Sequence, residues 1–143
     1  MGTSLWQTRD HIETTTGGFS VHDMTGKVAA WLVEEGAQEG LLTVLVRHTS
    51  ASLVIMENAD PDVMADLMDS LANLAPEDPS RYRHGTEGPD DMPAHIRTAL
   101  TQTHLSVPVT DGRMDLGMWQ GIWLLEHRAQ AQRRTLSLHY VGV

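Results

Sequence analysis

Leu41–Arg47 reads LLTVLVR, an apolar and partly β-branched run that ends in a single arginine. Such a run is typical of a strand buried on both faces of a sheet. Ser52–Met56, SLVIM, has the same character, and it either continues the first strand or pairs with it. Each run leads into a polar segment, so the sequence predicts strands with candidate functional side chains at their ends.

Three further segments have helical periodicity, and each follows an aspartate that can cap its first turn. In the second segment four aliphatic side chains fall on one stripe, which we expect to face the core. They are Val63, Leu67, Leu71 and Leu74. The expected helices lie between Asp23 and Gly36, from Pro61 onward after Asp60, and from Pro93 to Thr103 after Asp91.

The remaining segments have the patterns of strands. Ser4–Thr16 alternates loosely before a pair of glycines, and a turn is expected at Asp111-Gly112. In Leu136–Tyr140 apolar residues alternate with polar ones. The order of elements predicts an α+β fold with about three helices and a mixed, largely antiparallel sheet of the sandwich or barrel kind. A chain of 143 residues suits one domain, which we expect to span 1–143.

Composition limits the classes of partner. The formal net charge is −9 with only ten lysines and arginines, which disfavours binding to duplex nucleic acid. No apolar run is long enough to cross a membrane, the start lacks a signal-peptide pattern, and there are no cysteines, so we expect a cytoplasmic protein. A small phosphorylated substrate would need a metal ion or local arginines to reverse this acidity.

Two polar clusters follow the apolar strands. The first is His48-Thr49-Ser50, in which the histidine can hydrogen-bond the hydroxyl groups, as a structural histidine also does. The second is Glu57–Asp60, where Asp60 has a simpler alternative as a helix cap.

Residues 82–96 form a third cluster, YRHGTEGPDDMPAHI, which holds His84, His95, Glu87 and Asp91. With His48 these histidines would give a three-imidazole zinc site that keeps a position open for water or substrate. The spacing matches no tight metal motif, and a solvated turn is the simpler interpretation. The carboxylates can instead orient the imidazole rings or hold magnesium.

Gly117–Gly121 reads GMWQG, and glycines around Trp119 and Gln120 indicate a bulge or the close approach of a ligand. The alternative is a packed core tryptophan for which the glycines make room. The strand ends in Glu126-His127-Arg128, where Arg128 can bind an anion, although surface charge is the simpler interpretation of each residue.

Taken together, these segments resemble the YjbQ-type family, whose members are called secondary thiamine-phosphate synthases. The resemblance covers nearly the whole chain, and the combination is specific although each piece is short. Met118 and the run Met56–Asn58 depart mildly from the family pattern. The segments that carry the resemblance are His48–Ser50, Glu57–Asp62, His84–Gly88, Asp90–Ile96, Pro108-Val109 and Gly117–Glu126.

The resemblance implies an α+β fold assembled as a homotrimer, with polar pockets near the subunit boundaries. It also implies a weak or secondary thiamine-phosphate synthase activity, which joins hydroxymethylpyrimidine pyrophosphate to thiazole phosphate and releases pyrophosphate. We expect a divalent metal, Zn or Mg. The expected catalytic residues are His48, His84, His95, Glu87 and Asp91. The expected substrate-binding residues are Thr49, Ser50, Glu57, Asn58, Gly117, Trp119, Gln120 and Arg128. The expected metal ligands are His48, His84 and His95, with Asp60 and Asp91 as further candidates.

Two other functions fit the same residues. One is a zinc-dependent hydrolase in which Glu87 or Asp91 is the general base for the attacking water. The other is a trimeric protein that binds a small ligand without catalysis.

Overall fold

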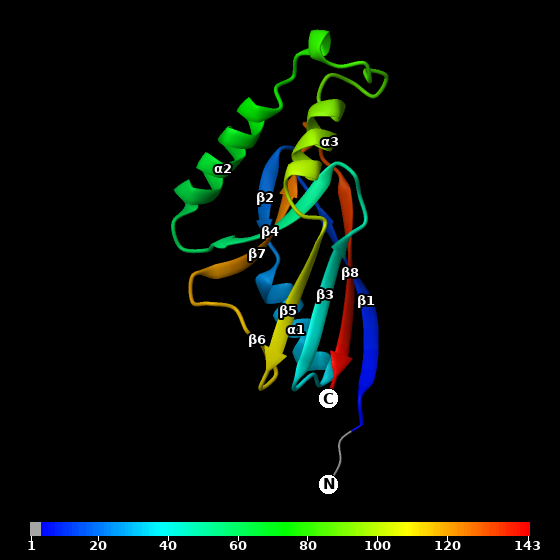
Figure 1. The fold of residues 1–143 in the computed structure, drawn as a ribbon, viewed down its shortest axis with the longest axis vertical. Coiled ribbons are helices and arrows are strands. Elements are labelled where there is room, and N and C mark those ends of the chain that lie inside the picture. The colour runs from blue at the N-terminus through cyan, green and yellow to red at the C-terminus, as the bar shows by residue number, and fades with distance from the viewer. Residues whose placement is uncertain (1–3) are drawn as a thin grey trace.

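Two antiparallel sheets form the centre of the molecule, in a computed structural model that describes residues 4–143 (Figure 1). One sheet has the strand order β1-β8-β3-β5-β6 and the other β2-β7-β4. The first contains β1 (Trp6–Thr15), β3 (Gly40–Val46), β5 (His104–Thr110), β6 (Arg113–Met114) and β8 (Arg133–Gly142). The second contains β2 (Ser20–Asp23), β4 (Ala51–Glu57) and β7 (Gln120–Glu126). The fold class predicted from the sequence is confirmed.

The apolar run that begins at Leu41 lies in β3, but only one face of this strand is buried within the chain. Val44 lies in the core, while Leu41 and Leu45 are 40% and 42% exposed. Because β3 pairs antiparallel with both β5 and β8, its side chains alternate between the core and an outer face. The expected strand at Ser52–Met56 is β4, which neither continues nor pairs with β3, since it pairs with β7 in the other sheet.

Three α-helices lie in the described part of the chain: α1 (Thr25–Glu35), α2 (Pro61–Leu74) and α3 (Asp91–Leu100), with a short 3₁₀ turn, η1 (Pro79–Arg81). Figure 1 shows α1 behind the larger sheet, and α2 and α3 at the end away from the C-terminus. The core joins α1 to both sheets through residues such as Leu32, Leu42 and Leu124. None of the helices within residues 4–143 has the length and apolarity needed to span a membrane.

Two helix predictions need correction. The buried side of α2 is formed by Met64, Met68 and Leu71, while Leu74 is 67% exposed. The predicted stripe is correct for Leu71 and for the partly buried Leu67, but it missed Met64 and Met68, because the aliphatic pattern ignored methionine, a flexible core residue. Asp60 does cap α2 as expected, since its Oδ1 accepts a hydrogen bond from the N–H of Asp62 at 2.9 Å.

Helix α3 begins earlier than predicted, and its cap position is occupied by Asp90. Asp91 is therefore the first residue of the helix rather than its cap, and its side chain contacts His84 instead of the helix backbone. At α1 the cap position is Met24, although Asp23 still accepts a hydrogen bond from the N–H of Thr25 at 3.0 Å.

The strand predictions for the C-terminal half hold. Asp111 and Gly112 have φ angles of 53° and 75°, the left-handed pair that a tight turn between β5 and β6 requires. In β8 the alternation is as expected, with Leu136, Leu138 and Tyr140 buried.

Candidate functional site

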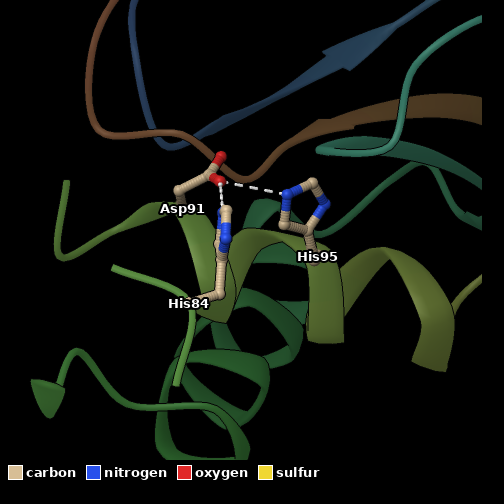
Figure 2. A group of neighbouring side chains, drawn as sticks. All are labelled: His84, Asp91 and His95. Carbon is tan, nitrogen blue, oxygen red and sulfur yellow. Dashed lines mark hydrogen bonds and ion pairs between the residues drawn. The ribbon is translucent and has the colours of Figure 1, made fainter. Parts of the chain in front are cut away.

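His84, Asp91 and His95 converge beside the first turn of α3 (Figure 2). Asp91 Oδ2 lies 2.7 Å from His84 Nε2 and 3.0 Å from His95 Nε2. One ligand atom from each residue lies within 4.8 Å of the others. The Asp91 side chain is only 6% exposed, whereas both imidazoles reach solvent. The three residues therefore form a small polar centre with one open side.

The chain builds this centre from one helical turn and one loop. Asp91 and His95 are four residues apart on α3, so their side chains lie on the same face of the helix. His84 comes from the loop that follows η1. That loop turns at Gly88, whose φ of 103° favours glycine, and the N–H of Asp91 closes the turn on the Gly88 carbonyl at 3.3 Å.

The second nitrogen of His95 fixes the tautomer of that ring. His95 Nδ1 lies 2.9 Å from the backbone carbonyl oxygen of Thr49, which can only accept a hydrogen bond. Nδ1 therefore carries a hydrogen, and in the neutral ring Nε2 presents a lone pair to Asp91 Oδ2. Two acceptors at 3.0 Å repel each other unless a proton or a cation lies between them. This is the arrangement by which proteins orient a metal-binding histidine.

Arg128 holds the other oxygen of Asp91. Its Nη1 lies 2.9 Å from Asp91 Oδ1, its Nε donates to Asp90 Oδ2 at 2.8 Å, and its Nη2 donates to the Glu87 carbonyl at 3.0 Å. From the sequence, Arg128 is expected to bind substrate and Glu87 to be catalytic. In the structure Arg128 orients Asp91 and ties the loop to α3, and Glu87 takes part through its backbone.

The carboxylate form of Asp91 is favoured by its surroundings. Burial acts to raise the pKa of Asp91, but the hydrogen bond with His84 and the charges of His95 and Arg128 outweigh burial and lower the pKa. Asp90 has a lowered pKa as well, chiefly because of its hydrogen bond from Arg128. The centre therefore presents an ionised carboxylate between two imidazoles.

His48, the third expected imidazole, lies outside this group of three. Its Nε2 accepts a hydrogen bond from the N–H of Thr135 at 2.9 Å, so that lone pair is already used. His48 does line a hollow of about 330 Å³ together with His95 and Thr98. Burial lowers the pKa of His48, and the charge of Arg134 acts in the same direction. The structure thus groups Asp91, already a further candidate ligand, with His84 and His95 and leaves His48 outside the group.

A buried ion pair, Glu126 with Arg134, supports the loop that carries Thr49. Arg134 Nε donates to Glu126 Oε1 at 2.8 Å, and Arg134 Nη2 donates to the Ser50 carbonyl and hydroxyl oxygens at 3.0 Å each. Both charged residues are buried, which corrects the interpretation of Glu126 as surface charge. Sequence reasoning did not single out Arg134. The available signal was that Arg134 falls in the alternating β8 pattern on the same face as the buried Leu136 and Leu138.

The remaining expected site residues gather at the other end of β4. Asn58 Nδ2 donates to the Gln120 carbonyl at 3.2 Å, and Glu57 Oε2 accepts from the N–H groups of Ala59 and Asp60. β4 runs from Ala51 to Glu57, a length of about 20 Å, so this group is separate from His95 within one chain. These residues fix the turns around β4 and β7.

The glycine and tryptophan motif lies in the same region. Gln120 Oε1 accepts from the N–H of Gly117 at 2.8 Å, which closes the loop before β7. Trp119 is 60% exposed, so the interpretation as a packed core tryptophan is wrong. Asp60, once a candidate metal ligand, is the cap of α2.

Comparison with known proteins places the chain in a family. The sequence model of the family described as UPF0047 protein YjbQ-like matches residues 10–143. The chain belongs to this family. Among YjbQ-family relatives, a UPF0047 protein of Synechocystis sp. is 51% identical over 136 residues, covering 95% of this chain and 92% of the relative. The UPF0047 protein YjbQ of Salmonella typhimurium is 46% identical over 99 residues, or 69% of this chain and 71% of that protein.

Solved structures share the same YjbQ-like fold. A YbjQ-like protein of unknown function from Sulfolobus solfataricus superposes with a TM-score of 0.90, covering 98% of this chain and all of that one, at 22% identity. A hypothetical protein from Aeropyrum pernix is 32% identical with a TM-score of 0.82, covering 94% of this chain and 99% of that one. The two-sheet architecture is therefore a property of the family.

Proposed function

We propose that this YjbQ-family chain is an enzyme that binds a divalent metal ion through His84 Nε2, Asp91 Oδ2 and His95 Nε2 and acts on a small phosphorylated substrate. The observation that carries the proposal is the contact of His95 Nδ1 with the Thr49 carbonyl. In the neutral ring this contact leaves the opposite nitrogen as a lone pair 3.0 Å from an ionised carboxylate oxygen, and a divalent cation can lie there in place of a proton.

The donor set favours zinc over magnesium. Two imidazoles and one carboxylate are the protein ligands of several catalytic zinc sites, which keep a fourth position open. Magnesium prefers oxygen ligands, so a site in which two of the three protein ligands are imidazoles suits it poorly. The exposure of His84 and His95 beside the buried Asp91 supports an open position on the imidazole side.

Thiamine-phosphate synthase chemistry is the reaction that we propose for this site. In it the thiazole nitrogen forms a bond to the pyrimidine methylene carbon while the carbon–oxygen bond to pyrophosphate breaks. A bound zinc ion would supply positive charge for the departing pyrophosphate oxygens. The chain's own part is to bind and orient the phosphates in the hollow beside His95, where Thr98 Oγ1 is buried and has no partner within residues 4–143. His48, protonated at Nδ1 because its Nε2 accepts from Thr135, lines the same hollow and offers a second donor.

A zinc-dependent hydrolase is the second candidate, and the three-ligand centre with an open side favours it. Asp91 would not be its general base, because one of its oxygens faces the imidazoles and the other faces Arg128. In both reactions His84 and His95 hold the same positions. The reactions differ in whether a phosphate ester is cleaved when no thiazole phosphate is present.

Zinc binding tests the shared part of both candidates. We expect the purified, metal-free chain to bind about one zinc ion per chain in a calorimetric titration, and His84→Ala or His95→Ala to weaken that binding at least about 100-fold. His104→Ala is the matched control, because His104 is an exposed histidine on β5 outside the centre. Product analysis of the zinc-loaded protein with hydroxymethylpyrimidine pyrophosphate, with and without thiazole phosphate, then separates transfer from hydrolysis. Equal zinc binding by all four proteins would sink the proposal.

We also propose that the chain assembles as a homotrimer through the outer face of the larger sheet. Leu41 pairs with Val141, which is 39% exposed, and Leu45 lies farther along the same face of β3. Figure 1 shows β3, β5 and β8 in front of α1, which packs on the opposite side of the sheet. Exposed aliphatic residues in the middle of a sheet are typical of a face that another subunit covers.

Light scattering after gel filtration tests the trimer. We expect the wild-type protein to have a mass of about 47 kDa, three times the 15.8 kDa of the chain, and Leu45→Glu to reduce it to that of one chain, because a buried unpaired carboxylate is costly. Val33→Glu is the control, since Val33 is exposed on α1 away from this face. A wild-type mass of one chain would contradict the proposal.

A further inference from the structure

Arg97 is a buried cation on α3 that takes no part in the proposed metal centre. It follows His95 by two residues, so its side chain leaves the helix about 200° away from that of His95. The residue is only 4% exposed. Helix α3 therefore carries two separate sets of polar groups, one on each side.

The partners of Arg97 are all uncharged. Its Nη2 donates to the Ala75 carbonyl at 2.8 Å, its Nη1 donates weakly to the His127 carbonyl at 3.4 Å, and its guanidinium carbon lies 4.9 Å from the centre of the Phe19 ring. Within residues 4–143 no carboxylate lies within 4.0 Å of it, and Nε has no hydrogen-bond partner. Burial lowers the pKa of Arg97 more than the charges of Glu77 and Asp90 raise it, so this guanidinium is suited to a further anion from outside the chain.

Arg97 lines a cavity of about 310 Å³, which we name the Arg97 cavity. Its other polar groups are His127, whose buried Nδ1 also lacks a partner within residues 4–143, and the exposed Glu77. The rest of the lining is apolar and consists of Phe19, Ala72, Pro76 and Ala129. The volume is at the lower end of the range for small-molecule sites, which are mostly apolar with a few fixed polar groups.

We propose that the Arg97 cavity binds a small carboxylic acid with an apolar or aromatic body. A carboxylate matches the planar guanidinium, and the apolar body would lie against Phe19 and the end of α2. A phosphate dianion fits less well, because the cavity offers one cation and has Glu77 in its lining. Phe19 is 39% exposed, and an aromatic ligand would cover part of its ring.

Benzoate is the probe that tests this site, with benzamide as the uncharged analogue and inorganic phosphate as a different anion. We expect benzoate at ten times its dissociation constant to raise the melting temperature of the metal-free protein by about 4 °C at constant ionic strength. Benzamide and phosphate should leave it nearly unchanged. The absence of a shift with benzoate would overturn the proposal.

Variants assign the binding to this cavity. Arg97→Met should weaken benzoate binding at least about tenfold, and Glu77→Gln should strengthen it by a smaller factor, since a neighbouring like charge is removed. Arg133→Met is the control for loss of a positive charge, because Arg133 pairs with Glu13 on the surface. Ala72→Phe occupies cavity volume and leaves the Arg97 side chain unchanged, and it should abolish binding even if the Arg97 variant fails to fold. Full benzoate affinity in Ala72→Phe or in a folded Arg97→Met would refute the assignment.

Discussion

Arg134→Met is expected to lower the free energy of unfolding by about 4 kcal/mol at pH 7, because it leaves the buried Glu126 carboxylate without its cation. Thr16 Oγ1, at 2.6 Å, and the N–H of Arg128, at 3.1 Å, would still donate to Glu126. These neutral donors only partly offset a buried negative charge. The loss should be far larger than for an exposed ion pair.

The pH dependence of this loss gives it a signature. In the wild-type protein burial acts to raise the pKa of Glu126, but the hydrogen bonds from Arg134 and Thr16 outweigh burial and lower it. That carboxylate therefore contributes stability above its unfolded pKa of 4.5, and the contribution is lost as pH falls through the lower folded pKa. Without Arg134, only Thr16 and the N–H of Arg128 oppose the effect of burial, so we expect the pKa of Glu126 to rise and the folded state to take up a proton as pH falls. The difference between variant and wild type should thus shrink as pH falls from 7 to 5.

Urea denaturation of both proteins at pH 7, 6 and 5 measures this difference. The comparison must be between the two proteins, because burial also lowers the pKa of His127 to about 4 in the wild type. His127 then costs stability as pH falls below 6.5, the ordinary pKa of histidine, in either protein. Glu126→Gln combined with Arg134→Met should recover part of the loss. Arg133→Met, which removes an exposed partner of Glu13, should change stability by less than about 1 kcal/mol.

A loss in Arg134→Met no greater than in Arg133→Met would show that the buried pair is unimportant for stability. A pH-independent loss would show that it arises from packing of the arginine stem. The expected result also affects the candidate site, since Arg134 holds Ser50 and the neighbouring Thr49 carbonyl holds His95. Zinc affinity of the folded variant should therefore fall as well.

The sequence predicted the fold better than it predicted the site, for reasons that particular residues show. Alternation in β8 and the turn at Asp111 are local patterns, and local patterns are readable along the chain. The burial of Glu126 and Arg134 depends on partners brought together across the sheets, and no local pattern marks it. The exposure of one face of β3 could not be predicted either, because an aliphatic run does not indicate which of its faces another element covers.

Within the site, the prediction depended on which of two neighbouring aspartates caps α3. Asp91 and Asp90 are equally good caps by residue type, and the prediction that Asp91 is the cap was wrong. With Asp90 at the cap position, Asp91 lies one turn before His95 and faces the imidazoles. The grouping of His84, His95 and the candidate ligand Asp91 was available from their clustering in one segment, but the position of His48 outside the group required the three-dimensional structure.

Asp91→Asn is expected to lower zinc affinity at least about 1000-fold, the largest effect that we expect at the candidate site. It removes the anionic member of the proposed ligand set, the carboxylate whose Oδ2 lies between the two imidazoles. Arg128→Met leaves the ligands in place but releases Asp91 Oδ1, and we expect a 10- to 100-fold loss, as is typical of residues that orient a metal ligand. Calorimetric titration of metal-free proteins with zinc measures both.

Asp90→Asn is the matched control for charge, because Asp90 is the neighbouring carboxylate and contacts Arg128 without facing the histidines. Its zinc affinity should fall by less than that of Arg128→Met. If the cluster were only a structural hydrogen-bond network, the three variants would differ in unfolding free energy and none would differ in zinc affinity. If the cluster is a metal centre, Asp91→Asn must lower zinc affinity even where the fold is unchanged. Asparagine can still accept a hydrogen bond from His84, but it cannot replace the charge of the carboxylate. The order of zinc affinities, with Asp91→Asn weakest, then Arg128→Met, then Asp90→Asn, therefore separates ligation from structural support.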